Sequence, residues 1–169
     1  MTDPQDPSAD PLPGPVRTTD GYGLGGAPAD GTKLPWSQVV EWLTQARNYW
    51  VCTTRADTRP HAMPVWGLWV DGQLWFSTDP SSVKGQNLLA RPDIVVHLES
   101  GDEVCVLEGR AVRVTDADAL EHFDDIYEAK YDVRPSAMGE AAAVYVLHPT
   151  TALAWTEAEF PTTATRFAF

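Results

Sequence analysis

The stretch from His61 to Val70 restricts the possible folds more than any other part of the chain, because it is apolar on both faces of a strand. One face carries Met63, Val65 and Trp69, and the other carries Ala62, Trp66, Leu68 and Val70. In a small antiparallel barrel, a strand normally has one face in the core and one face in water. The second apolar face therefore needs a cover, and a helix, a partner subunit or a flat ligand would each serve.

Pro64 stands in the middle of this strand, although proline has no amide hydrogen to donate to a neighbouring strand. Such a position indicates an edge strand, a bulge, or a place where a ligand lies along the backbone. Asp71-Gly72 then separates the strand from a second run, Gln73 to Thr78, and this dipeptide is a strong hairpin signal. On these residues alone, an edge strand buried under a helix stays open beside the ligand.

The remaining segments predict an α+β protein. Apolar residues at helical spacing predict helices over 34–46, 81–90 and 116–131. Further strands are expected at Tyr49 to Thr54, Asp93 to Glu99, Glu103 to Thr115, Ala143 to His148 and Thr151 to Glu157, and the last two precede the C-terminal Thr163 to Phe169. Six or seven strands in meander order, with helices inserted rather than alternating, favour an antiparallel barrel over a doubly wound sheet.

Two regions differ in composition. Residues 1–32 are rich in proline and glycine and nearly free of large aliphatic residues, which predicts a disordered or loosely packed N-terminal tail. Residues 33–169 then form one domain, since 169 residues with 43% hydrophobic content suffice for one core. Gly21 to Gly26 formally matches the G-x-G-x-x-G pattern of dinucleotide sites. No strand precedes it and no helix follows it, so we reject that interpretation.

The net charge, the cysteines and the histidines argue against several classes of partner and site. The net charge of −12 disfavours nucleic acid and anionic membrane surfaces as partners. No apolar run is long enough to cross a bilayer. Cys52 and Cys105 lie in apolar runs without a signal-like segment upstream, which favours free thiols and a cytoplasmic location. The four histidines are far apart and no pair has metal-ligand spacing, so we assign no metal.

The segment after the hairpin has the features of a phosphate site. Asp79-Pro80 or Ser81 would cap a helix, and Ser81, Ser82 and Lys84 lie in its first turn. Free amides and the positive end of the helix dipole favour an anion there. The alternative on these residues alone is an ordinary capped surface helix.

Taken together, these segments resemble the pyridoxamine 5′-phosphate oxidase-like split-barrel superfamily, and more narrowly its actinobacterial flavin/deazaflavin oxidoreductase branch. The resemblance covers Leu34 to Phe169 and depends on the order and spacing of several motifs. These are Tyr49 to Thr54, Arg59 to Trp66, Ser82 to Pro92, Val106 to Gly109 and Thr165 to Phe169.

The resemblance implies an FMN-binding type of antiparallel split β-barrel that forms a homodimer, with two coenzymes at the subunit interface. The doubly apolar strand would then face the core on one side and the partner and the coenzyme ring on the other. Ser82 and Lys84 would hold the phosphate, with Asn87 in the following helix, and Arg166 would reach a coenzyme from either subunit. The full set of expected coenzyme-binding residues is His61, Met63, Pro64, Val65, Trp66, Ser77, Thr78, Ser81, Ser82, Val83, Lys84, Asn87 and Arg166.

The lack of basic residues on the strand from His61 to Val70 bears on which coenzyme binds. Relatives that use FMN to oxidise pyridoxamine phosphate carry basic residues on the strand matching His61 to Val70, and this chain has no Lys or Arg there. The resemblance therefore implies coenzyme F420 and hydride transfer to a small unsaturated organic substrate. An FMN-dependent, pyridoxamine 5′-phosphate oxidase-like protein is the alternative, and a non-catalytic coenzyme carrier is the second. Candidate proton donors are His61, Tyr127 and Tyr131, although we expect His61 to be a buried structural histidine.

Overall fold

The computed structural model describes residues 10–15, 33–138, 142–160 and 162–169 of the chain. Its strands are β1 (Leu12–Pro15), β2 (Asn48–Thr54), β3 (Pro60–Val70), β4 (Gln73–Thr78), β5 (Asp93–His97), β6 (Glu103–Arg113), β7 (Ala143–Thr156) and β8 (Thr165–Ala168). Its helices are α1 (Trp36–Gln45), α2 (Val83–Ala90) and α3 (Ala117–Tyr131), with short 3-10 turns at Pro135–Met138 and Glu157–Glu159.

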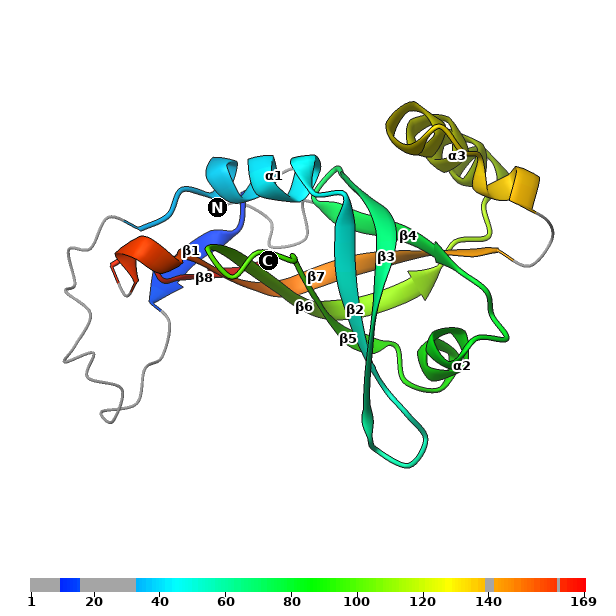
Figure 1. Cartoon of the computed structure of the whole chain (residues 1–169), viewed down its shortest axis with the longest axis horizontal. Coiled ribbons are helices and arrows are strands. Elements are labelled where there is room, and N and C mark those ends of the chain that lie inside the picture. Colours follow the sequence, from blue (N-terminus) through cyan, green and yellow to red (C-terminus); the bar gives the residue numbers. More distant parts are fainter. Residues whose placement is uncertain (1–9, 16–32, 139–141, 161) are drawn as a thin grey trace, which may run out of the picture.

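The strands close into an antiparallel barrel, as the sequence predicts. Six of them follow the order β7-β4-β3-β2-β5-β6, and pairing between β6 and β7 closes the ring. Strands β8 and β1 extend the sheet from the far half of β7 (Figure 1). The expected α+β split barrel with inserted helices is therefore confirmed.

The core fills the barrel because alternate residues of each strand point inward. On β2 these are Tyr49, Val51 and Thr53, all less than 4% exposed. Helix α1 covers one end of the barrel and buries Val39 and Leu43 against this core (Figure 1). The Tyr49 hydroxyl, deep in the barrel, donates to the carbonyl of Leu43 and so fastens α1 to β2.

Helix α3 covers the outer face of β3 and β4. It buries Phe123, Tyr127 and Tyr131 in a second apolar cluster with Leu68 and Val144. The Asp116 side chain caps the helix by accepting from the Ala119 amide at 2.9 Å. The Lys130 ammonium lies 2.7 Å from the Ala46 carbonyl and 3.2 Å from that of Gly67, which links α3 to α1 and β3.

Several predicted boundaries need correction. The strands expected at 143–148 and 151–157 are one strand, β7, because a bulge opposite Glu108 and Gly109 absorbs the extra residue Thr150. The helix expected from residue 81 begins at Val83, and β5 ends at His97. In the segment expected to be a tail, Leu12–Pro15 pairs with β8.

Two further predictions concern membrane-spanning segments and the glycine-rich motif. No helix in the described ranges is both long and apolar enough to cross a membrane. The glycine-rich Gly21 to Gly26 lies outside the described residues.

Candidate functional site

Strand β3 is divided into a covered half and an exposed half. Trp66, Leu68 and Val70 pack against α3, so a helix covers the second apolar face there. Toward the N-terminal end of β3, Ala62, Met63 and Pro64 are exposed, and Met63 keeps 49% of its surface accessible. The second apolar face predicted from the sequence thus has its cover within the chain for only half of its length.

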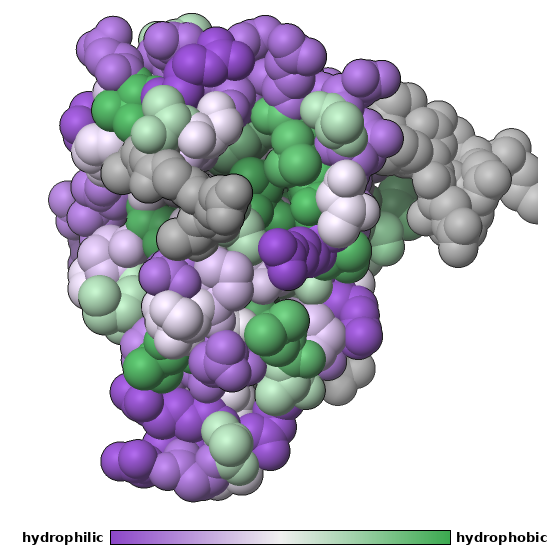
Figure 2. Space-filling view, turned by 90° about the vertical axis from the view of Figure 1, so that its right-hand side faces the viewer, coloured by the Kyte–Doolittle hydropathy of each residue, from purple (hydrophilic) through white to green (hydrophobic). Residues whose placement is uncertain are grey.

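A cavity of about 390 Å³ opens where the two halves of β3 meet. It is lined by Asn48, Pro64, Val65, Trp66, Ser77 and Tyr127. Figure 2 views this side of the molecule and shows hydrophobic residues gathered in a hollow below a polar upper rim. Four of the expected coenzyme-binding residues, Pro64, Val65, Trp66 and Ser77, therefore line one space together with the candidate proton donor Tyr127.

Two aromatic residues of the cavity lining, Trp66 and Tyr127, pack against Tyr131 behind them. The rings of Trp66 and Tyr131 lie parallel with their centroids 4.9 Å apart, and the Tyr127 ring lies 4.7 Å from that of Tyr131. Burial, and then the neighbouring Tyr131, raise the pKa of Tyr127 to about 12, while the Ser77 hydroxyl acts in the opposite direction. Tyr127 is thus a neutral phenol at physiological pH and still carries its proton.

The two candidate tyrosines have different surroundings. The Tyr131 hydroxyl accepts from the Gly67 amide at 3.0 Å and lies 2.8 Å from the Arg47 carbonyl oxygen. Its oxygen is therefore occupied by the backbone of β3 and of the segment before β2. Tyr127 lines the cavity and Tyr131 does not, so Tyr127 is the better placed donor of the two.

The predicted phosphate segment forms a compact turn at the start of α2. Ser82 is the N-cap: its Oγ accepts from the Gly85 amide at 3.0 Å and donates to the Asp79 carbonyl at 2.6 Å. Thr78 Oγ1 lies 3.3 Å from the same hydroxyl. The Ser81 amide and hydroxyl both donate to the Asp79 carboxylate at 2.7 Å. Ser81 is therefore engaged by the chain's own carboxylate, and Ser82 rather than Ser81 or Asp79-Pro80 starts the helix.

Lys84 is the most unusual residue of this segment. It is only 9% exposed, and among the described residues no hydrogen bond or ion pair reaches its ammonium. Burial lowers its pKa from the usual value. Lysines are seldom buried unless paired, because desolvating a charge is costly. The side chain is thus a largely buried cation with no anion partner among the described residues.

His61 faces the same region from β3. It is partly exposed rather than buried, so the expectation of a buried structural histidine is wrong. It lies opposite Thr53, next to the turn that joins β2 to β3, and its side chain is partly exposed. Partial burial, followed by the charges of Arg55 and Lys84, lowers the pKa of His61.

Helix α2 is fastened to β2 by two polar contacts. Asn87 donates to Thr53 Oγ1 at 2.9 Å, and Arg91 donates to the carbonyls of Arg55 and Ala56. These bonds hold Arg55 in the same neighbourhood as Lys84. Thr53 and Arg55 were missed from the sequence. The available signal was weak: Thr53 is a polar residue on the inward face that it shares with Tyr49 and Val51.

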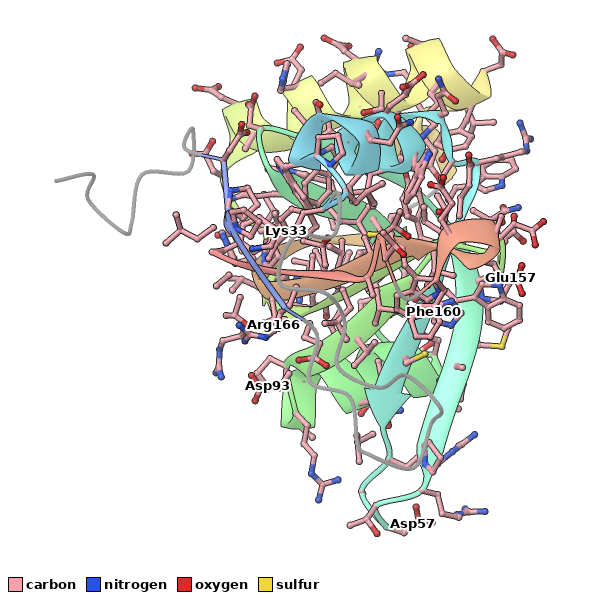
Figure 3. All side chains as sticks on the ribbon, turned by 90° about the vertical axis from the view of Figure 1, so that its left-hand side faces the viewer. Lys33, Asp57, Asp93, Glu157, Phe160 and Arg166 are labelled. Carbon is pink, nitrogen blue, oxygen red and sulfur yellow. The ribbon has the colours of Figure 1, made fainter. Side chains whose placement is uncertain are left out.

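Two expected residues are exposed in the single chain. Val83 is 44% exposed. Arg166 stands on the exposed surface of β8 and donates to Thr151 Oγ1 at 3.0 Å. Figure 3 shows it well away from Asp57, which marks the tip of the β2–β3 hairpin. Within one chain, Arg166 is therefore not brought together with Lys84 and His61.

The cysteines and acidic residues offer no comparable site. Cys52 and Cys105 are both free, and burial raises the pKa of each thiol. In the part of the chain that the structure describes, no three His, Cys, Asp or Glu side chains gather closely enough to hold a metal ion.

Comparison with known proteins identifies the family to which this arrangement belongs. Residues 36–156 match the family model described as pyridoxamine 5′-phosphate oxidase. Among proteins with curated descriptions, none matches the chain.

Solved structures with the same fold have low sequence identity to this chain. A conserved hypothetical protein of Mycobacterium tuberculosis has a TM-score of 0.67 at 21% identity, over 78% of this chain and 89% of that protein. An F420 reductase has a TM-score of 0.54 at 22% identity, over 66% and 93%. A heme-binding protein of Mycobacterium smegmatis has a TM-score of 0.58 at 16% identity, over 70% and 52%. At these identities the likeness concerns the fold.

Proposed function

The chain belongs to the pyridoxamine 5′-phosphate oxidase family, and from this premise we propose that it is an oxidoreductase that binds coenzyme F420 and transfers a hydride to a small unsaturated organic substrate. The coenzyme phosphate would bind at Lys84, and the ring would lie along the exposed half of β3.

The observation that carries this proposal is the largely buried side chain of Lys84, whose ammonium has no partner among the described residues. A phosphate would supply the missing negative charge, and the His61 ring and the first amides of α2 would supply further donors. The net charge of the chain is −12, so basic side chains are scarce. Lys84 and Arg55 nevertheless both lie near His61, and no described carboxylate pairs with Lys84. The residues present thus fit a group with one phosphate.

The ring would be accommodated by the cavity at Pro64 and Trp66. Its lining is uncharged, and the proline removes an amide that would otherwise need a partner. When bound, a deazaflavin supplies the hydride, and the protein supplies binding, orientation and exclusion of water. Tyr127, whose pKa is raised to about 12, would donate the proton that a reduced carbon–carbon or carbon–oxygen bond requires.

A second copy of this chain would complete the site. The exposed apolar surface formed by Ala62, Met63 and Pro64 adjoins the cavity, and burying it against a partner would exclude water from the ring. In such a dimer, Arg166 of one subunit would be available to the coenzyme of the other. Solution mass from light scattering tests this part of the proposal, and a stable monomer would contradict it.

F420 is favoured over FMN by the lack of Lys and Arg on β3 and is in keeping with the F420 reductase among the structures of this fold. Titrating the purified protein with F420, FMN and riboflavin, and following fluorescence or calorimetry, distinguishes the two. Binding of F420, followed by oxidation of its reduced form with an acceptor from a panel of enones and quinones, is the expected result. Tighter binding of FMN with a yellow spectrum would replace F420 by FMN.

The second candidate is a coenzyme carrier without catalytic activity. Its support is the engagement of the Tyr131 hydroxyl by backbone groups, which leaves Tyr127 as the one tyrosine lining the cavity among the described residues. This candidate predicts coenzyme binding without hydride transfer to any acceptor. Failure to bind any of the three compounds would exclude both candidates.

A further inference from the structure

A chain of polar side chains ends on His61. Asn87 donates from Nδ2 to Thr53 Oγ1 at 2.9 Å, and that oxygen lies 3.4 Å from His61 Nδ1 and 3.5 Å from the His61 carbonyl oxygen. Thr53 is only 3% exposed, so water does not compete for its hydroxyl. We propose that Thr53 and Asn87 position His61 as a proton-linked ligand of the phosphate: His61 is neutral in the free protein and takes up one proton when the anion binds beside Lys84.

Thr53 can serve both protonation states of the ring. The Asn87 amide donates to Thr53 Oγ1, and the Thr53 hydroxyl proton has both His61 Nδ1 and the His61 carbonyl oxygen within reach. In the proposed free state this proton points to His61 Nδ1. The ring proton is then on Nε2, which faces away from Thr53 and is free to donate to an anion. When His61 becomes protonated, Nδ1 donates to Thr53 Oγ1 instead, and the hydroxyl turns to the His61 carbonyl oxygen. Both acceptors that this rotation needs are present within 3.5 Å.

The charges around His61 set the direction of the effect. Partial burial, and then the charges of Arg55 in the hairpin and of Lys84 on α2, lower the pKa of His61 from its usual value. Arg91, also on α2, is held by backbone carbonyls, and Arg59 is paired with Asp57 at the hairpin tip. An anionic phosphate or sulfate group bound beside Lys84 adds negative charge near His61 and raises the pKa of the ring in the bound form.

The sign of the pH dependence follows from these two states. A histidine whose pKa is higher in the complex than in the free protein binds the anion more tightly as pH falls through the pKa of the complex. The gain levels off below the pKa of the free protein. A nearby opposite charge commonly shifts a pKa by about one unit or more, so we expect about tenfold tighter binding at the acidic end.

Sulfate is the appropriate probe, because its charge stays constant between about pH 5.5 and about pH 8, whereas a phosphate monoester itself titrates near pH 6. The full chain is titrated with sulfate at several pH values, and nitrogen NMR of the His61 ring reports its tautomer and its pKa. We expect a neutral ring protonated at Nε2 in the free protein, a pKa that rises on sulfate binding, and an affinity that rises about tenfold toward acidic pH. A neutral ring protonated at Nδ1, or an unshifted pKa, would overturn the proposal.

Three variants separate positioning from folding. His61→Gln should bind sulfate without pH dependence, whereas an unchanged slope would assign the effect to another group and refute the proposal. Thr53→Ser keeps the hydroxyl and should keep the slope. Thr53→Val removes the hydroxyl and should flatten the slope; equal slopes in a folded Thr53→Val protein would refute the role of Thr53. If the valine variant does not fold, the serine and glutamine variants still decide the question.

The inference rests on the proposed function for the identity of the anion, and the two can fail separately. Coenzyme binding that is as tight at acidic as at neutral pH, together with an unshifted His61, would leave the proposed function intact and overturn the inference. A pH-dependent sulfate site in a protein that binds neither F420 nor FMN would support the proton-linked anion site and overturn the proposed function.

Discussion

Replacing Lys84 by methionine should stabilise the free protein and weaken coenzyme binding at the same time. Lys84 as a residue is 9% exposed, and no described side chain or carbonyl forms a hydrogen bond with its ammonium. Methionine keeps the apolar stem and removes the charge. A buried polar group without a partner typically costs about 1–3 kcal/mol, so the free energy of unfolding of Lys84→Met should rise by about that amount at neutral pH.

The stabilisation should depend on pH in a defined direction. Because burial lowers the pKa of Lys84 in the folded state, the wild-type protein pays the penalty at any pH below that folded pKa. The penalty is relieved as pH rises from the folded pKa toward the unfolded value of 10.5, because the folded protein then carries the neutral amine. The difference between variant and wild type, measured by urea unfolding, should therefore be largest near neutral pH and decrease in alkaline solution.

The affinity of Lys84→Met for the coenzyme should fall, although its free energy of unfolding rises. A hydrogen bond to a charged group contributes about 1.5–3 kcal/mol, which corresponds to roughly 10- to 150-fold weaker binding of F420 or FMN by Lys84→Met. Lys130→Met is the matched control, since Lys130 lies on α3 with the Ala46 carbonyl at 2.7 Å and lines no part of the cavity. The control should lose stability and keep its affinity. A Lys84→Met protein that is destabilised like the control, with unchanged affinity, would refute the reasoning.

Three further outcomes are expected. Tyr127→Phe should lower kcat by about 10²-fold or more, the usual contribution of a positioned proton donor, and leave coenzyme affinity unchanged; loss of affinity alone would remove Tyr127 from proton transfer. Gly109→Ala should cost about 1–3 kcal/mol of unfolding free energy in urea, because an added Cβ would lie 2.2 Å from the His148 carbonyl oxygen at the bulge. Met63→Lys should yield a folded monomer by light scattering, since Met63 is 49% exposed in the single chain and its face is assigned to the partner; an intact dimer would place the interface elsewhere.

The parts of the fold that could be predicted are those encoded by adjacent residues. Asp71-Gly72 forms the predicted turn, with φ values of 49° and 74° that suit the hairpin twist. Ser82 and Asp116 cap their helices through side chains that are visible in the sequence. Such signals need no knowledge of which strand lies beside which.

The predictions of secondary structure that failed are those that depend on pairing between segments distant in the sequence. Pro13 and Pro15 argue against a strand, yet both belong to β1. Leu12 and Gly14 keep the amides that can bond to β8. The two prolines alternate with them, at positions on the outer edge where no donor is needed. Pro149-Thr150 looks like a turn between two strands, but Thr150 forms a bulge in β7 opposite Glu108 and Gly109, and the strand continues through it.

In the candidate site, too, the features encoded by adjacent residues were predictable and those that depend on distant segments were not. Its helix start was visible as a motif, whereas the meeting of His61, Lys84 and Arg55 depends on the register of β2 against β3 and on the bonds that fasten α2 to both. The partial exposure of His61, contrary to expectation, follows from that register and not from its neighbours in the sequence.

The distribution of charge in this chain separates the rate of coenzyme binding from its strength. At long range, a net charge of −12 repels an anionic coenzyme, and this repulsion is screened beyond about 8–10 Å at physiological salt. At short range, Lys84, Arg55 and a protonated His61 attract it within a desolvated space where screening is weak. Added salt should therefore speed association, opposite to the slowing expected for an oppositely charged pair, while dissociation changes little. Stopped-flow measurements over a range of salt concentrations would reveal this, and an association rate that falls with salt would mean that the local basic cluster, not the net charge, governs the approach.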